Sequence, residues 1–104
     1  MMSENRGERE GYHELAQFFG AYLNQDYKEI YGDIDGAIET FVRETTLARR
    51  DVVAGQLRRL LEEFGDDSNL RTRALYYGLE VNGGASKGIS RRAWLTEVAE
   101  RLAS

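Results

Sequence analysis

Apolar residues recur along most of this chain at the three- and four-residue spacing of an α-helix. The clearest stripe lies within residues 12–24 and consists of Leu15, Phe18, Phe19, Tyr22 and Leu23. Residues at this spacing share one face of a helix, which packs against a core. Further stripes run over residues 34–42, 47–64 and 91–102, and a shorter one starts near residue 68. The pattern therefore predicts five short helices.

Polar capping residues and glycines mark where the predicted helices begin and end. A side-chain oxygen just before a helix accepts a hydrogen bond from a backbone N–H of the first turn. Candidate caps precede the last four helices: Asp33 or Asp35, Thr45 or Thr46, Asp67 or Ser68, and Ser90. We expect residues 25–33 (QDYKEIYGD) and 82–88 (NGGASKG) to be links between helices, the second of them without a core-forming residue.

Residues 75–81 (LYYGLEV) form the one segment whose composition also suits a β-strand. A lone strand needs a partner, and the sequence offers no second candidate. The expected fold class is therefore all-α, a compact bundle of about five short helices. The residues expected in its core are Phe18, Phe41, Leu57, Leu61, Trp94 and Val98.

The length of 104 residues fits a single domain, which we expect to span residues 12–104. Residues 1–11 are polar and carry charges of both signs, so we expect a flexible N-terminal tail. The tail lacks the basic start and apolar stretch of a secretory signal. No apolar run approaches the roughly 20 residues of a membrane span. With no cysteine for disulfides, these features predict a cytoplasmic protein that binds no membrane.

Charge is unevenly distributed along the chain. The net charge is −4, yet residues 11–48 hold seven acidic against two basic residues and net −5. Residues 49–104 hold ten basic and eight acidic residues and net +2. An acidic face repels nucleic acid and anionic membranes and attracts a basic partner. The alternative on charge alone is an ordinary solvated surface.

No residue pattern typical of catalysis or phosphate binding is present. His13 is the only histidine, and its sequence neighbour Glu14 would point elsewhere on a helix, so no oriented partner supports a general base. The glycine-rich residues 82–88 lack the order of a P-loop, because Lys87 precedes Gly88 and a predicted helix precedes the loop. We therefore expect no catalytic residue and no cofactor.

Metal and nucleic-acid binding are also disfavoured. Asp33, Asp35 and Glu39 cluster in sequence, but the segment does not have the ligand spacing of an EF-hand. Acids at the positive end of a helix dipole explain them adequately. Six arginines in residues 49–73 are interleaved with five acids, so no basic stripe for DNA or RNA remains.

The aromatic and acidic stretch after the first helix is the remaining candidate binding surface. Tyrosines there supply large contact area at low entropic cost. We expect Tyr22 to be a core residue, and Tyr27 either to face a partner or to pack under the second helix. The candidate interface residues are Asp26, Tyr27, Tyr31, Asp33, Asp35 and Glu39. If a partner used another face, the next candidates are Asp66, Asp67 and the loop around Lys87.

Two segments resemble a known family. Residues 15–27 (LAQFFGAYLNQDY) resemble the opening of contact-dependent growth inhibition immunity proteins of the CdiI type. Residues 88–102 (GISRRAWLTEVAERL) resemble the closing helix of that family, with its Gly-x-Ser start and Trp-Leu pair. One departure is Val81-Asn82-Gly83, where relatives often have Tyr-x-Pro.

The resemblance implies a function. CdiI-type proteins bind the C-terminal toxin domain of a large CdiA-type surface effector delivered by a neighbouring cell and block it in the cytoplasm. Many such toxins are nucleases with a basic cleft, which an acidic protein can occupy. The resemblance thus implies a non-enzymatic toxin inhibitor that is a monomer when free. The alternative is a helical adaptor or regulatory subunit for a host protein.

Overall fold

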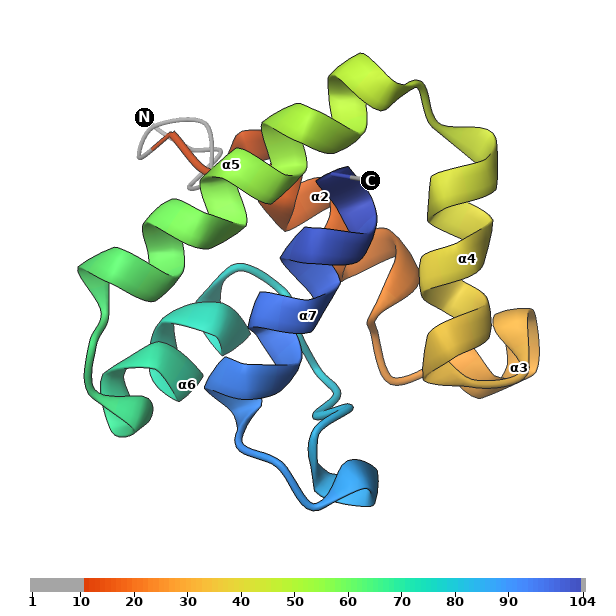
Figure 1. Cartoon of the computed structure of the whole chain (residues 1–104). Coiled ribbons are helices and arrows are strands. Elements are labelled where there is room, and N and C mark those ends of the chain that lie inside the picture. The colour runs from red at the N-terminus through yellow and green to blue at the C-terminus, as the bar shows by residue number, and fades with distance from the viewer. Residues whose placement is uncertain (1–10, 104) are drawn as a thin grey trace, which may run out of the picture.

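The computed structural model describes residues 11–103, apart from the side chain of Ser86, and contains six α-helices and one 3-10 helix (Figure 1). These are α2 (His13–Tyr22), α3 (Tyr27–Tyr31), α4 (Ile34–Glu44), α5 (Leu47–Glu63), α6 (Asp67–Tyr76), η1 (Ala85–Lys87) and α7 (Arg91–Ala103). No strand occurs in the described chain, so the all-α class is confirmed. The predicted tail lies outside the described residues except for Gly11.

The short helix α3 lies in the segment that the sequence pattern assigned to a link. It has only five residues and buries none of them, so it carries no apolar stripe that a periodicity could reveal. Gly32 ends it with a φ of +87°, a left-handed conformation that glycine adopts without strain. The bundle therefore has one more helix than the five expected.

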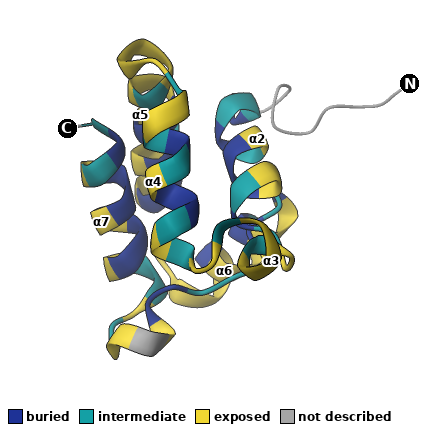
Figure 2. Ribbon diagram, turned by 90° about the vertical axis from the view of Figure 1, so that its right-hand side faces the viewer, coloured by how far each residue is buried: buried dark blue, intermediate teal, exposed yellow. Residues whose placement is uncertain are grey.

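The core forms where α7 packs along α5 (Figure 1). Helix α2 also packs against α5. The dark-blue buried residues in Figure 2 lie on the inward faces of these helices. All six predicted core residues are buried, and Trp94 is the largest side chain among those that are fully enclosed. Burying a side chain of this kind stabilises the fold by about 1.5–3 kcal/mol relative to exposure.

Hydrogen bonds from two arginines link α5 and α7, one at each end of the pair of helices. Arg92, near the start of α7, donates hydrogen bonds to the carbonyl oxygens of Leu61 and Phe64 at the end of α5. Arg50, near the start of α5, donates to the carbonyl oxygen of Leu102 at the end of α7, 3.2 Å away. The final carbonyls of a helix lack intrahelical partners and carry partial negative charge. Each helix thus caps the C-terminus of the other.

The start of α2 is held by α5. Tyr12 precedes the helix without capping it through its side chain, and Gln56 of α5 accepts a hydrogen bond from the Leu15 N–H at 2.9 Å instead. The Gln56 amide also donates to Glu14 at 2.8 Å, and this bond lowers the pKa of that carboxyl. The Tyr12 hydroxyl donates to Glu63 at 2.5 Å, and burial raises the pKa of this phenol.

The chain leaves α6 through a tight turn at Gly78. The N–H of Gly78 bonds to the carbonyl of Leu75 and that of Leu79 to the carbonyl of Ala74, at 2.9 and 3.0 Å. This bonding pattern is the Schellman motif, and Gly78 has the positive φ it requires, +102°. A Cβ on Gly78 would also lie 3.4 Å from the Cα of Gly20 in α2. Residues 79–82, which follow this turn, belong to neither a helix nor a strand.

The loop before α7 packs on the core, contrary to the sequence-based expectation. Gly83 and Gly84 are buried, and a Cβ on Gly83 would lie 2.3 Å from the Trp94 indole. Gly83 therefore lies directly against the indole ring, an approach that only a residue without a side chain allows. Ser90 caps α7 as predicted, accepting a hydrogen bond from the Ala93 N–H at 3.0 Å.

We expect Trp94→Ala to lower the free energy of unfolding by about 3–5 kcal/mol, since it removes a fully enclosed aromatic and leaves a cavity under the loop. Chemical denaturation followed by circular dichroism measures the change. Thr96→Ala, at an exposed position of the same helix, is the control and should change stability by less than about 0.5 kcal/mol. Equal effects of the two variants would contradict this account of the core.

The two facing glycines should respond in opposite directions to alanine. Gly78→Ala forces a side chain into a left-handed conformation and should cost about 1–2 kcal/mol. Gly20→Ala lies inside α2, where an added Cβ meets nothing within 4 Å, and should stabilise by up to about 1 kcal/mol. Thermal unfolding of both variants is the measurement, and destabilisation by Gly20→Ala would show that α2 is packed more closely there.

Candidate functional site

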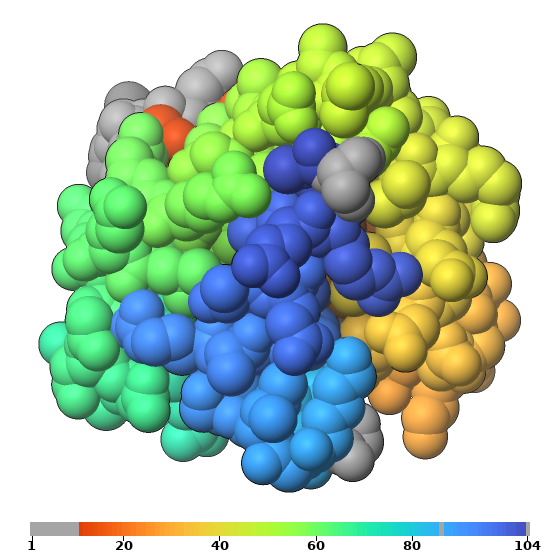
Figure 3. All heavy atoms as spheres, viewed as in Figure 1, coloured from red at the N-terminus to blue at the C-terminus, as the bar shows by residue number. Residues whose placement is uncertain are grey.

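A groove of about 270 Å³ lies between the α3–α4 corner and the loop that precedes α7. Three of the six candidate interface residues line it, namely Tyr27, Asp33 and Asp35. Its opposite wall comes from Gly83, Lys87 and Trp94. Figure 3 shows α7 between α5 and α4, with the α3–α4 corner at lower right and the loop at the bottom. The groove thus joins segments at least 48 residues apart in sequence.

Close packing of backbone holds the α3–α4 corner. Asp33 caps α4 by accepting a hydrogen bond from the Gly36 N–H at 2.6 Å. A Cβ on Gly36 would lie 2.5 Å from the carbonyl oxygen of Tyr31, so the end of α3 rests directly on the start of α4. The carboxylate of Asp33 is therefore held in place at the wall of the groove, and it also caps helix α4.

Asp35 is linked to α7 across the same corner. Its Oδ1 lies 3.2 Å from Nη1 of Arg101, and the two side chains are 58% and 37% exposed. A pair this exposed contributes at most about 1 kcal/mol. It nevertheless places Arg101 beside a second hollow of about 290 Å³ lined with Glu39, Val42 and Arg43. Glu39 is thereby separated from the groove that holds Asp33 and Asp35.

Tyr31 packs inward. Its ring stacks on that of Tyr22, with centroids 5.4 Å apart, and the Tyr22 ring meets the edge of Phe41 at 5.1 Å. The Tyr31 hydroxyl donates to the carbonyl oxygen of Ala21 at 3.4 Å. Tyr22 is half-buried against the core, and burial raises the pKa of its phenol. This stack connects the corner to the core, so Tyr31 supports the surface from below.

The exposed face of α3 carries one residue that the sequence analysis did not single out. Ile30 is 61% exposed, the highest fraction among the large apolar side chains of the described chain. It lies one helical turn after Asp26, which precedes α3 and makes no side-chain cap, so the two share a face. Only recognition of the short helix α3 in the sequence would have pointed to Ile30 as an exposed residue. Asp26 stays outside the groove, as do Tyr31 and Glu39.

The chemistry of the groove suits a cation. Two carboxylates stand at one wall, and the aromatic side chain of Tyr27, which is only partly buried, also lines it. Guanidinium groups bind carboxylates through charge-assisted hydrogen bonds and stack on aromatic faces. Lys87, on the opposite wall, is paired with Glu97 of α7 at 3.4 Å. An arginine or lysine side chain of a partner would therefore meet carboxylate and aromatic ring together.

The described chain holds neither a metal cluster nor a membrane-spanning helix. Within residues 11–103, no three histidine, cysteine or acidic side chains come together as a possible metal site. None of the helices in that range is both long and apolar enough to cross a bilayer. His13, the only histidine, does not line the groove.

Comparison with known proteins yields a family match. The family model described as CdiI immunity protein matches residues 11–102, and this confirms the resemblance that residues 15–27 and 88–102 carry. Neither the curated proteins nor the solved structures contain a significant match. Since the family match extends from just before α2 almost to the end of α7, the chain belongs to the CdiI immunity protein family.

Proposed function

We propose that this immunity protein neutralises its cognate toxin by covering a basic surface of the toxin domain with the α3–α4 corner. Family membership supports the role of an immunity protein for a contact-dependent growth inhibition toxin. The finer proposal is that the toxin domain is the C-terminal region of a CdiA-type effector, that it is a nuclease, and that it is blocked in the cytoplasm. The protein itself acts by binding, as a monomer in the free state.

The observation that carries this proposal is the groove beside Asp33 and Asp35. A nuclease must hold a polyanion, so its substrate-binding surface presents arginine and lysine side chains. The groove offers such a side chain two carboxylates within a partly enclosed, aromatic-lined space. Desolvated charge pairs of this kind hold a complex together, whereas the more distant acids mainly accelerate association.

The exposed face of α3 supplies the apolar part of the proposed interface. Interfaces are held chiefly by a few anchor residues surrounded by polar contacts. Ile30 stands exposed next to the groove-forming corner, and Asp26 and Glu29 flank it in sequence. The proposed contact therefore combines an apolar anchor on α3 with a charged recess at the start of α4.

Removing the two groove charges should weaken toxin binding by about 2–5 kcal/mol, because a basic side chain of the toxin is left buried without its partner. The variant is Asp33→Asn with Asp35→Asn, chosen because asparagine caps a helix as well as aspartate does. The control is Asp51→Asn with Glu62→Gln on α5, which removes the same charge from exposed positions.

Binding is measured by calorimetry against a catalytically inactive toxin domain, at low and at high salt. Protection of cells that express the active toxin is the second measurement. We expect the groove variant to lose affinity, salt dependence and protection while the control keeps all three. If both variants bind like the wild type, the toxin uses another face.

The isolated chain should turn over no RNA, DNA or nucleotide. The groove is lined by no histidine, serine, threonine or cysteine. Its carboxylates are engaged, Asp33 with the Gly36 N–H and Asp35 with Arg101, so we expect neither to serve as a general base. Purified protein is incubated with labelled substrates, and His13→Ala is compared with the wild type. Turnover that disappears in His13→Ala would contradict the proposal that this chain acts by binding alone.

A further inference from the structure

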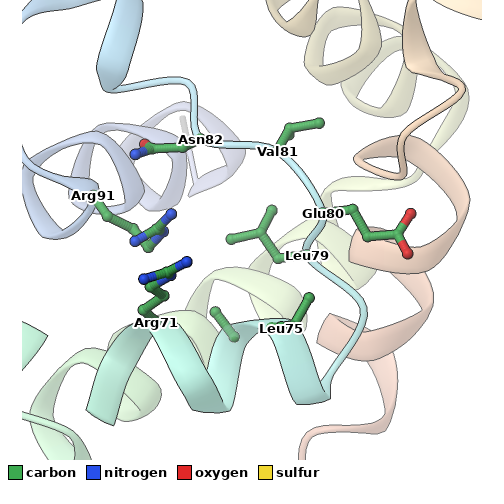
Figure 4. A pocket seen from close by; sticks show the side chains of 8 residues that line it. Arg71, Leu75, Leu79, Glu80, Val81, Asn82 and Arg91 are labelled. Atoms are coloured by element: carbon green, nitrogen blue, oxygen red, sulfur yellow. The ribbon is translucent and has the colours of Figure 1, made fainter. Parts of the chain in front are cut away.

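A second pocket, of about 200 Å³, lies on the other side of the loop and has the opposite charge. Arg71 of α6 and Arg91 at the start of α7 line it, and Figure 4 shows their guanidinium groups converging from the two helices. The floor is apolar and comes from Ala74, Leu75, Leu79 and Val81. The pocket therefore combines two positive charges with an apolar surface.

Neither guanidinium group has a hydrogen-bond or ion-pair partner within the described chain. Their neighbour Arg92, by contrast, bonds to two carbonyl oxygens and lies 3.7 Å from Asp67. Glu80 is the one acid lining the pocket, and Figure 4 shows its carboxylate turned away. Glu80 instead accepts a hydrogen bond from the Gln25 N–H at 2.9 Å. Two like charges thus converge without a counter-charge, which costs energy unless an anion joins them.

The floor indicates that the anion has apolar surroundings. Leu75 of α6 is 60% exposed, and Leu79 beside it is buried. A free inorganic anion gains nothing from such a floor, whereas an acidic side chain on a protein surface brings apolar neighbours with it. Two guanidinium groups can bind one carboxylate through several parallel hydrogen bonds.

The pocket and the groove lie on either side of the same loop. Asn82 lines the pocket and Gly83, the next residue, lines the groove. The loop between them is held in place by the Gly83 contact with Trp94 and by the hydrogen bond from the Glu80 N–H to the Leu23 carbonyl at 3.1 Å. A protein that covers the groove therefore reaches the pocket on the other side of this loop.

We propose that the Arg71–Arg91 pocket binds an aspartate or glutamate side chain of the toxin domain, flanked there by an apolar residue. This inference rests on the proposed function of the groove and adds a second contact of opposite sign. Two oppositely charged contacts on either side of one loop allow a single orientation of the partner. A toxin with another charge pattern then meets repulsion at one of them, which is a source of specificity.

The test measures the affinity of the full chain for the inactive cognate toxin domain. Arg71→Gln with Arg91→Gln should weaken binding at least about tenfold, as expected when one partner of a buried charge pair is truncated. Arg49→Gln with Arg58→Gln, on the exposed side of α5, is the control and should stay within about twofold of the wild type. The free Arg71/Arg91 variant should melt no lower than the wild type, because it loses only a repulsion.

The possible outcomes separate the two proposals. If the Asp33/Asp35 variant loses affinity and the Arg71/Arg91 variant does not, the groove is the contact and the pocket inference is wrong. If the wild type fails to bind the toxin at all, the proposed function fails and the inference fails with it. A lowered melting temperature of the Arg71/Arg91 variant would show a structural role instead.

A further measurement distinguishes the carboxylate from a phosphate. A fluorescent RNA oligonucleotide is titrated with wild type and with the Arg71/Arg91 variant, and we expect no binding by either. Binding by the wild type that the variant loses would identify a phosphate site and overturn the inference. On the toxin, replacing its surface acids one at a time by the corresponding amides should identify one position that reproduces the tenfold loss.

Discussion

The contact between the Trp94 ring and the backbone of Gly83 connects the core of this protein to its proposed binding surface. Trp94 is enclosed because α7 packs along α5, and the reciprocal arginine bonds hold the two helices in register. Because the ring is held in this way, it supports the loop before α7 at Gly83. The groove and the arginine pocket are the two sides of that loop, so both depend on the same aromatic side chain.

In the proposed interface, Asp33 would serve both stability and binding. Its carboxylate caps α4 and also stands at the wall of the groove. A cap contributes about 1 kcal/mol, so a substitution that removes both the oxygen and the charge lowers stability and affinity together. An amide at this position separates the two effects because it keeps the acceptor and loses the charge. Asp35 has no capping role and is paired only with a half-exposed arginine.

Net charge alone describes the surface poorly. The acidic excess of residues 11–48 is concentrated at the α3–α4 corner and on α4, but Arg101 of α7 lies against it. Several arginines of the second half bond to carbonyl oxygens or acids, among them Arg50, Arg92 and Arg101. Arg71 and Arg91 do not, and their guanidinium groups line one pocket. In the proposed complex, the toxin domain would meet an acidic recess and a basic recess on either side of one loop. Such an arrangement favours a partner whose charges match both recesses, and it favours one orientation of that partner.

The helical periodicity of the sequence was sufficient to predict the all-α class, the five longer helices and the six core residues. This is possible because a stripe of ten or more residues reports the burial of one face directly. Local chemistry was also sufficient to predict the Ser90 cap and to place Asp33 and Thr46 among the candidate caps, since a cap depends only on residues two or three positions away.

Only the tertiary structure decided which residues meet. Helix α3 is too short to carry a stripe, so Ile30 could not be recognised as exposed. The glycines of residues 82–88 looked like a plain link, because nothing in their sequence shows that one of them lies against a tryptophan eleven residues later. Tyr27, Asp33 and Asp35 were predicted as candidates from local composition, but their grouping with Lys87 and Trp94, and the separation of Glu39 from them, depend on how α7 crosses the bundle. Contacts between distant segments are set by packing, which periodicity along the chain does not encode.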